Sequence, residues 1–489
     1  MAIIDINLSS KLVNGLGSNN ELSTTMAEEL GLFFQAAYTF SSTHPYYSTY
    51  SLVGNNLRLN YSDDGYSSYS GVALADPNAL SGSASATNLE QYFPSYYRLT
   101  ASGNLNYHYE ATANGPNIQG TGGTLTAAAI QTLLPSYSPN YDSNLGNVIL
   151  GIRGNVTLSP NSDISGVVTT LTGSADRLLT SSTLTGNFNI SGNATNIAQN
   201  LGTLSVSGTA TSYIEKYADG SGVSLSNIAF AVTGDTTIDN KLLANPNNLP
   251  ADDVINVTLG AAPFSAWVIA SGAGNDKISI KGGASSLSVN AGTGNDMITL
   301  GDSNHVVDGG AGTDTVVFNG VRSAYSVSKT VNGYAVLSSG GTDTLNGVER
   351  LHFSDTTLAL DINGNGGQVY RLYQAAFNRT PDNGGLGFWI NAMDSGATLK
   401  DIALEFTKSG EFRSMYGGAN PDNTTFLDKL YHNVLHRAGD QSGFDFWLGH
   451  LNSGTLTQAA ALAEFGESAE NQATLISVIG NGFTYTPYG

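Results

Sequence analysis

The sequence has no cysteine, and this absence excludes disulfide bonds and thiolate metal sites. Charged residues make up only 12% of the 489 residues, about half the usual share. The 19 lysines and arginines are outnumbered by 39 aspartates and glutamates, which gives a formal net charge of −20. Nucleic acids and anionic lipids repel such a chain, so neither is expected as a partner. Bound cations would relieve the repulsion among the carboxylates.

Long hydrophobic runs are also missing. The longest apolar stretches, such as residues 29–38, fall short of the roughly 18 to 20 residues that cross a bilayer, so no membrane insertion is expected. The first residues carry neither a basic segment nor a sustained apolar one, so a cleaved secretory signal is not expected. Glycine, serine, threonine and asparagine are abundant instead. This composition is typical of a β-rich extracellular protein.

A short repeat lies near the middle of the chain. Each copy places two glycines and an aspartate ahead of a three-residue strand: Gly272, Gly274 and Asp276; Gly292, Gly294 and Asp296; Gly310, Gly312 and Asp314. The pattern matches the nonapeptide of calcium-binding parallel β-helices. Glycine permits a tight turn and close packing of successive turns. Aspartate supplies the hard oxygens that calcium prefers, and turn carbonyls supply the rest. These nine residues are the predicted metal site, and calcium is the predicted ion.

The spacing of the repeat predicts where the ions lie. If each coil takes two nonapeptides, loops about 18 residues apart stack on the same edge. The three aspartates are separated by 20 and 18 residues, so one edge is expected to carry all three loops. The opposite edge, at residues 281–284 and 301–304, has lost most of the motif. Calcium is therefore expected mainly on the first edge. The alternative is a series of glycine-rich turns without metal.

These loops resemble the repeat-in-toxin (RTX) family of bacterial exoproteins. The resemblance covers residues 252–360, from a degenerate leading coil at Asp252-Asp253 to a closing segment at residues 341–353. A hairpin that turns at Asn332-Gly333 is expected before that segment. The resemblance implies a short parallel β-roll, type I secretion of the unfolded chain, and folding in the calcium outside the cell.

Three domains are expected in a mainly β fold with an α-helical domain at its C-terminal end. Residues 1–245 form an α+β domain of mostly antiparallel strands, with an early helix at residues 24–38. Within it, a helix is expected near residues 125–134 and a helical or irregular piece near residues 164–179. Residues 246–360 form the β-roll. Residues 361–489 form the helical domain, together with the C-terminal secretion region.

The helical domain contains an internal repeat at an offset of 58 residues. Leu372, Tyr373, Arg379, Asp382, Gly385, Phe388 and Trp389 recur as Leu430, Tyr431, Arg437, Asp440, Gly443, Phe446 and Trp447. Residues 368–473 resemble an uncharacterised helical domain that often follows RTX repeats. The two aspartates could be ligands and the two tryptophans carbohydrate platforms. The favoured interpretation makes the aspartates helix N-caps and the Phe-Trp pairs core that packs one unit on the other.

No catalytic constellation is present: His-Glu-x-x-His and Gly-x-Ser-x-Gly are both absent, and no enzyme is predicted. His432 and His436 are four residues apart and could share a metal on a helix, although a solvated helix face is favoured. Asp361 begins a stretch like an EF-hand loop, but Leu372 replaces its final glutamate, so a linker turn is expected. His44 and Tyr107 give a faint resemblance to bacterial haemophores, which hold haem between a histidine and a tyrosine.

The sequence therefore predicts a secreted protein of the extracellular space or cell surface, stabilised by calcium and without catalysis. Its composition resembles that of bacterial surface-layer proteins, so a self-assembling layer or matrix component is favoured. The expected partners are further copies in a homo-oligomer or lattice and a cell-surface polysaccharide. The alternatives are a surface adhesin, a haem-binding protein, and a secreted enzyme whose site lies in the N-terminal domain.

Overall fold

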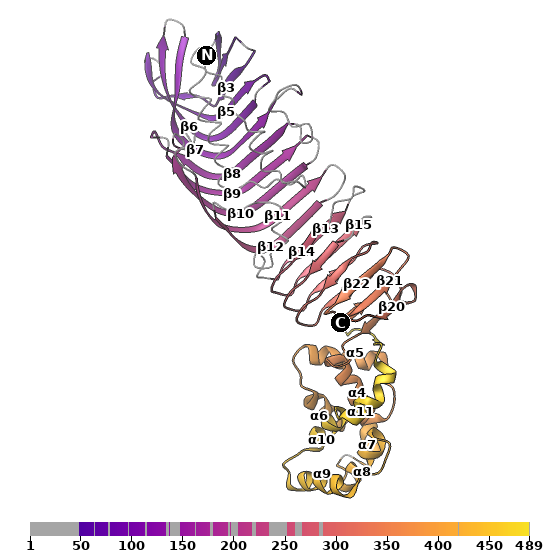
Figure 1. The fold of residues 1–489 in the computed structure, drawn as a ribbon. Coiled ribbons are helices and arrows are strands. Elements are labelled where there is room, and N and C mark those ends of the chain that lie inside the picture. Colours follow the sequence, from indigo (N-terminus) through magenta and orange to yellow (C-terminus); the bar gives the residue numbers. More distant parts are fainter. Residues whose placement is uncertain are drawn as a thin grey trace. The chain divides into compact units, whose positions relative to one another are not determined.

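The computed structural model describes residues 48–62, 64–76, 79–95, 97–112, 115–133, 136, 147–161, 163–176, 179–193, 196, 204–217, 222–233, 252–259, 267–282, 287–418 and 420–488. The chain divides into two compact units, residues 1–287 and 288–489. The described part is mainly β in its N-terminal portion and helical at its C-terminal end, as predicted (Figure 1). In these ranges no helix is long and apolar enough to span a membrane. The helix predicted at residues 24–38 lies outside them.

The first unit is built on an antiparallel sheet. Its strands are β1 (Thr49–Val53), β2 (Asn56–Asn60), β3 (Tyr66–Ser70), β4 (Ala73–Leu74), β5 (Ser81–Phe93), β6 (Tyr97–Thr112), β7 (Gly115–Thr132), β8 (Val148–Leu158), β9 (Asp163–Ala175), β10 (Leu179–Asn193), β11 (Ser205–Tyr217) and β12 (Gly222–Thr233). Each strand pairs with the next along the chain, except that β3 and β4 both pair with β5. The predicted antiparallel character of this region is confirmed.

Two segments that the sequence predicts as helical or irregular are strands, so both predictions are wrong. Residues 125–132 belong to β7, which pairs with β6 and with β8 despite its helix-favouring alanine run. Residues 164–175 belong to β9. Its buried side chains are Ile164, Val168, Leu171 and Ala175. They have helix-like spacing because β9 carries one extra residue opposite β8, between residues 168 and 170, and this bulge interrupts the strand alternation. Sheet pairing outweighs local propensity in both segments.

The antiparallel sheet passes directly into parallel strands. Strand β13 (Val254–Leu259) pairs antiparallel with β12 and parallel with β15 (Lys277–Gly282). A short strand, β14 (Trp267–Ala270), lies between them in sequence. Hydrogen bonding thus continues across the domain boundary predicted near residue 245.

Two sets of short parallel strands and a hairpin lie at the start of the second unit and are named here the parallel-strand region (residues 287–352). Its strands are β16 (Leu287–Asn290), β17 (Met297–Thr299), β18 (Val306–Asp308), β19 (Thr315–Val317), β20 (Ser326–Lys329), β21 (Tyr334–Leu337), β22 (Thr342–Asn346) and β23 (Arg350–His352), with a 3-10 turn, η3 (Arg322–Ala324). Strands β16, β18 and β22 form one parallel set, and β17, β19 and β23 form the other.

The central residue of these strands is apolar and fully buried. Val289, Val307 and Leu345 occupy this position in one set, and Ile298, Val316 and Leu351 occupy it in the other. Ile298 and Val316 are the central residues of the strands that follow the second and third glycine loops. The predicted hairpin is confirmed as β20 and β21, joined by residues 330–333, and β21 also pairs with β22.

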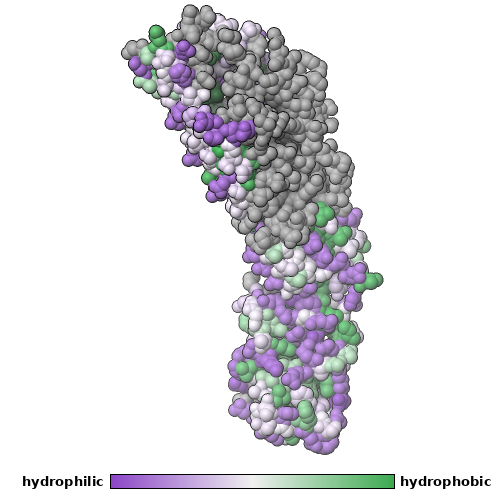
Figure 2. Space-filling model, turned by 60° about the vertical axis from the view of Figure 1, so that its left-hand side comes forward, coloured by the Kyte–Doolittle hydropathy of each residue, from purple (hydrophilic) through white to green (hydrophobic). Residues whose placement is uncertain are grey.

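A run of helices follows. They are α4 (Asn365–Phe377), α5 (Asn383–Asp394), α6 (Leu399–Lys408), α7 (Gly410–Tyr416), α8 (Asn423–Val434), α9 (Gln441–Ser453), α10 (Gln458–Gly466) and α11 (Ala469–Ile479). The predicted repeat is visible as α4–α6 and α8–α10. Helix α4 is the centre of the core, with contacts to α5, α6, α8 and α10. Figure 2 shows that hydrophilic residues predominate on the visible face of this helical part, with small separate hydrophobic areas.

The chain returns from the helices to the parallel-strand region. Strand β25 (Phe483–Tyr485) pairs antiparallel with β24 (Thr357–Ala359), which itself pairs antiparallel with β23. The hydroxyl of Thr356 also donates to the carbonyl of Tyr485 at 3.1 Å. The last described strand therefore extends the sheet to which β23 belongs.

Candidate metal centre

Two of the predicted glycine loops, residues 291–296 and 309–314, stack on one another in the second unit. The N–H group of Gly294 donates to the carbonyl of Ala311 at 2.9 Å. The N–H group of Ala311 donates in turn to the carbonyl of Gly292 at 2.8 Å. The structure therefore places these two loops on one edge.

Close stacking requires glycine in the second of these loops. Gly310 and Gly312 have φ angles of 94° and 141°, which residues with a Cβ atom rarely adopt. A Cβ atom at Gly310 would collide with the carbonyl oxygen of Gly292, and one at Gly312 with that of Gly294. Glycine at these positions lets the carbonyl oxygens of one loop approach the next.

The aspartates that follow the glycines form a ladder of buried carboxylates. The Oδ1 atom of Asp314 accepts a hydrogen bond from the backbone N–H of Asp296 at 2.9 Å. The Oε2 atom of Glu349 accepts one from the backbone N–H of Asp314, also at 2.9 Å. Asp296 and Asp314 are buried. The sequence interpretation omitted Glu349, whose signal is an acidic residue just before a strand in the closing segment.

The first unit carries the same arrangement around the remaining predicted loop, which contains Asp276. The Oδ1 atom of Asp276 accepts from the backbone N–H of Asp253 at 2.8 Å. The side chain of Asp252 accepts from the backbone N–H of Asn275 at 2.7 Å. Asp253 and Asp276 are both buried. Asp253 belongs to the degenerate leading coil and was not among the predicted site residues.

Burial leaves these carboxylates electrostatically unfavourable. It raises the pKa values of Asp276, Asp314 and Glu349, and it raises that of Asp253 to about 7, with added repulsion from Asp276 and Asp252. Both side-chain oxygens of Asp253 and the Oδ2 atom of Asp314 are buried without a hydrogen-bond partner. A buried, uncompensated carboxylate destabilises a fold unless it is protonated or meets a cation.

The donor atoms at this edge are of the kind that calcium takes. Within the described ranges, no three acidic or histidine side chains gather closely enough to hold a metal by themselves. A cation would therefore use backbone carbonyls of residues 291–296 and 309–314 as well as the carboxylates of Asp296 and Asp314. Oxygen donors drawn from side chains and turn carbonyls suit calcium.

The opposite edge keeps the ladder of hydrogen bonds from side chains to backbone N–H groups, but it has fewer buried carboxylates. The Oδ1 atom of Asn304 accepts from the backbone N–H of Thr342 at 2.6 Å, and that of Asp343 accepts from the backbone N–H of His305 at 2.9 Å. Burial lowers the pKa of His305, which favours the neutral imidazole, and raises that of Asp343 to about 6. One carboxylate here replaces the stacked pair of the first edge. Residues 283–284 of this edge lie outside the described part.

The stretch that resembles the start of an EF-hand is a linker turn, as predicted. Asp361 forms a buried ion pair with Arg350, and its Oδ2 atom accepts from the backbone N–H of Gly366 at 2.8 Å. The Asp361 carbonyl accepts from the N–H groups of Gly364 and Gly367. This carboxylate therefore neutralises Arg350 and accepts a hydrogen bond at the start of helix α4.

The repeated aspartates of the helical part are N-caps, as predicted. Asp382 accepts from the N–H of Gly385 at the start of α5, and Asp440 accepts from the N–H of Gly443 at the start of α9. The expectation that His432 and His436 lie on one helix is wrong. Helix α8 ends at Val434, and His436 has a left-handed φ of 52°.

The aromatic pairs are only partly as predicted. Trp389 packs against Phe406 of α6, and Trp447 packs against Phe465 of α10, so each tryptophan serves the core of its own repeat. The adjoining phenylalanines are exposed: Phe388 is 40% and Phe446 is 59% accessible. The prediction that the Phe-Trp pairs pack one repeat on the other is therefore wrong.

A cavity of about 320 Å³ lies on the sheet of the first unit. Its lining is rich in tyrosine and aliphatic side chains and includes Leu57, Tyr69, Val72, Tyr107 and Tyr109. Tyr107 is the tyrosine of the haem hypothesis. Burial raises its pKa, which disfavours the tyrosinate that would bind iron. His44 lies outside the described residues.

The comparisons with known proteins concern the helical part. A family model described as "Domain of unknown function (DUF4214)" matches residues 365–416 and 403–475. These matches overlap the region, residues 368–473, in which the sequence resembles an uncharacterised helical domain. No curated protein matches the chain.

Proposed function

We propose that this protein is a secreted, calcium-stabilised structural component of a bacterial surface layer or matrix. In this proposal, residues 252–360 form an RTX-type β-roll whose glycine-loop edge binds calcium outside the cell after type I export. The helical part closes the C-terminal end of the roll. No catalytic step is part of the proposed function.

The observation that carries the proposal is the ladder of buried carboxylates at the glycine loops. Asp314 donates its N–H to Glu349 and accepts from Asp296, so the hydrogen bonds fix the carboxylates at one edge without neutralising their charge. A divalent cation supplies the missing charge. A ligand bound only by the folded state adds about 2.7 kcal/mol of stability at a hundred times its dissociation constant.

The proposed assembly of copies of the chain depends on the same neutralisation of carboxylates by calcium. At a formal net charge of −20, copies of the chain repel one another in the absence of cations. Calcium lowers that charge and fixes the fold at the same time. Extracellular proteins without disulfides depend on such sources of stability, and this chain has no cysteine.

The test is negative-stain electron microscopy with light scattering on the full chain, titrated from chelator to millimolar calcium chloride. Ordered sheets or tubes that appear with calcium and disperse with chelator are the expected result. Asp314→Asn, which keeps the hydrogen bond to Asp296 but removes the charge, is expected to weaken them. Asp302→Asn is the matched control, because Asp302 is exposed on the other edge.

Two results would count against this function. A chain that stays monomeric at millimolar calcium would contradict self-assembly while leaving calcium binding intact. A chain whose unfolding temperature is the same in chelator and in calcium would contradict the calcium site itself.

The tyrosine-lined cavity favours a second candidate, a ligand-binding adhesin. Phenol rings with an apolar floor suit the faces of sugar rings, and the cavity is large enough for one or two of them. Binding would be measured by tyrosine fluorescence during titration with oligosaccharides. Ala84→Phe, which places a ring in the lining, should abolish binding, whereas Ala460→Phe in helix α10, outside the lining, should not.

A further inference from the structure

The carboxylate ladder is joined to the helical part through the backbone of Asp314. Its carbonyl oxygen accepts two hydrogen bonds, from the N–H of Glu349 at 3.1 Å and from the N–H of Arg350 at 3.0 Å. Glu349 returns its side chain to the N–H of Asp314. If the loop of Asp314 becomes disordered, Arg350, the first residue of β23, therefore loses a backbone hydrogen bond that holds it in place.

Arg350 extends from this strand into a buried cluster of charges. Its guanidinium is 3% exposed and forms an ion pair with Asp361, and Nη2 lies 3.7 Å from Asp394 at the end of α5. The ring of Tyr485 lies 6.0 Å from the guanidinium carbon. Asp361 follows β24 in the linker, whereas Asp394 belongs to α5, so the arginine loses this second carboxylate when the helical part is not docked.

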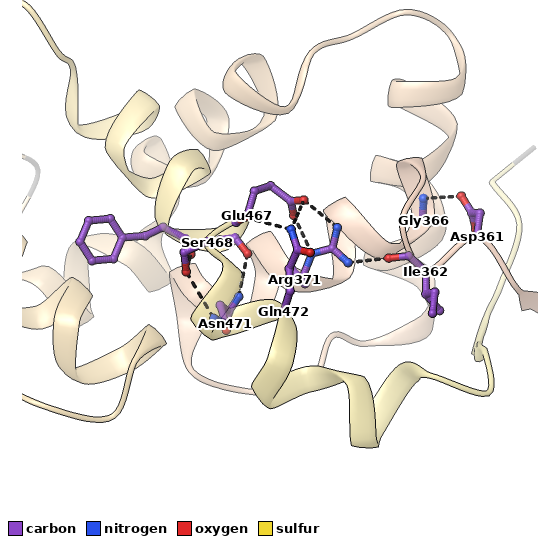
Figure 3. Close-up of polar contacts among 10 residues, drawn as sticks. Asp361, Ile362, Gly366, Arg371, Glu467, Ser468, Asn471 and Gln472 are labelled. Carbon is purple, nitrogen blue, oxygen red and sulfur yellow. Dashed lines mark hydrogen bonds and ion pairs between the residues drawn. The ribbon is translucent and has the colours of Figure 1, made fainter.

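Hydrogen bonds join the helices to one another and to the linker near this cluster. Arg371 of α4 donates to the carbonyl of Ile362 in the linker and forms two hydrogen bonds of 2.7 Å with Glu467 (Figure 3). Asn365 donates to Asp394 at 2.9 Å. The linker, the first helix and the last helices therefore form one hydrogen-bonded body around Asp361.

The segment after α11 contacts both strand β24 and helix α5. Strand β25 pairs with β24, and the N–H of Thr486 donates to the carbonyl of Asn383 at 3.1 Å. A Cβ atom at Gly387 of α5 would collide with the carbonyl oxygen of Thr486. The tail can lie along α5 only because residue 387 is glycine.

We propose that calcium binding at the ladder and docking of the helical part on the parallel-strand region stabilise each other through Asp314 and Arg350. This inference rests on the proposed function, because it takes the ladder as the calcium site. Such coupling is reciprocal: calcium tightens the docking, and loss of docking weakens calcium by the same factor. The helical part thus regulates calcium affinity without contributing a ligand.

The test combines calorimetric titration of the full chain with calcium chloride and hydrogen exchange of the backbone amides. Gly387→Ala displaces the tail without touching the ladder, and Gly449→Ala in α9 is its control, since a Cβ at Gly449 meets no atom. Arg350→Met removes the buried cation. We expect both Gly387→Ala and Arg350→Met to weaken calcium binding by at least about fivefold. Exchange of β24 and β25 should also speed up, with Gly449→Ala unchanged.

The outcomes separate the two proposals. Calcium affinity that stays within about twofold of the native chain, while β24 and β25 exchange freely, would overturn the coupling and leave the calcium site standing. Absence of calcium binding by the native chain would overturn both. Because Gly387→Ala leaves every buried charge in place, a folding failure of Arg350→Met does not remove the test.

Discussion

Arg371 and Glu467 join the two helical repeats across their boundary. The guanidinium of Arg371 is 4% exposed, and both of its hydrogen bonds to Glu467 measure 2.7 Å (Figure 3). Arg379 pairs in the same way with Glu411 of α7, and Arg437 with Glu470 of α11, but both of these pairs lie at the surface. The three pairs share one geometry and differ in burial.

The first prediction uses this contrast in burial. Arg371→Met should lower the free energy of unfolding by about 2–4 kcal/mol, because it leaves the carboxylate of Glu467 without its buried partner. Arg437→Met should lower the free energy of unfolding much less, since exposed ion pairs contribute little. Urea unfolding followed by circular dichroism measures both. Equal losses in the two variants would show that burial of Arg371 does not matter.

The second prediction concerns the stacking of the glycine loops. Gly312→Ala should destabilise the parallel-strand region by about 3 kcal/mol or more, from strain at a φ of 141° and collision with the Gly294 carbonyl. Gly449→Ala, in open space within α9, should be neutral or slightly stabilising. Thermal unfolding compares them. A native unfolding temperature for Gly312→Ala would refute the requirement for glycine.

The third prediction compares Asp314→Asn with the native chain in chelator and in calcium. In chelator, Asp314→Asn should stabilise the protein, because it removes a buried charge whose pKa burial has raised. In millimolar calcium chloride the same variant should gain less stability than the native chain. The measurement is the calcium-induced shift in unfolding temperature. An undiminished shift would mean that the Asp314 carboxylate is not needed for binding.

The fourth prediction concerns pH and Asp343, on the edge that lacks the carboxylate pair. Burial raises the pKa of Asp343 to about 6 from its ordinary value of 3.8. Between these two pH values the folded state keeps a proton on Asp343 that the unfolded state has released. Its effect on stability must therefore become more unfavourable as pH rises from about 4 to about 6, and stay so above.

Asp343→Asn tests this directly, because asparagine still accepts the N–H of His305. The variant should match the native chain near pH 4 and exceed it in unfolding free energy above about pH 6. Unfolding is measured in chelator at both pH values. A constant difference between the two proteins would show that Asp343 does not titrate in this range.

Sequence alone was informative where the pattern is local. The glycine loops, the buried Val and Ile positions, the hairpin before β22 and the N-caps Asp382 and Asp440 all follow from residues close together in the chain. Helix α4 and its repeat partner α8 were predictable for the same reason. The parallel pairing could be inferred from the repeat because each copy resembles its neighbour.

The rest depends on contacts between distant segments. Ile164, Val168 and Leu171 have helical spacing only because β9 carries an extra residue where it pairs with β8. Glu349 joins the ladder because its longer side chain reaches a loop 35 residues earlier. Nothing local in the sequence predicts that Arg350 meets Asp394, or that Trp389 faces inward while Phe388 faces outward.

The pairing of β24 with β25 also determines an order of folding events. Thr357 lies opposite Tyr485, so the sheet edge at β24 meets its partner only after helices α4 to α11 have been traversed. Helices assemble through local contacts and form fast, whereas contacts between distant residues form late. The strand at the end of the chain should therefore be the last to join, and until it does, β24 presents an open edge to other chains.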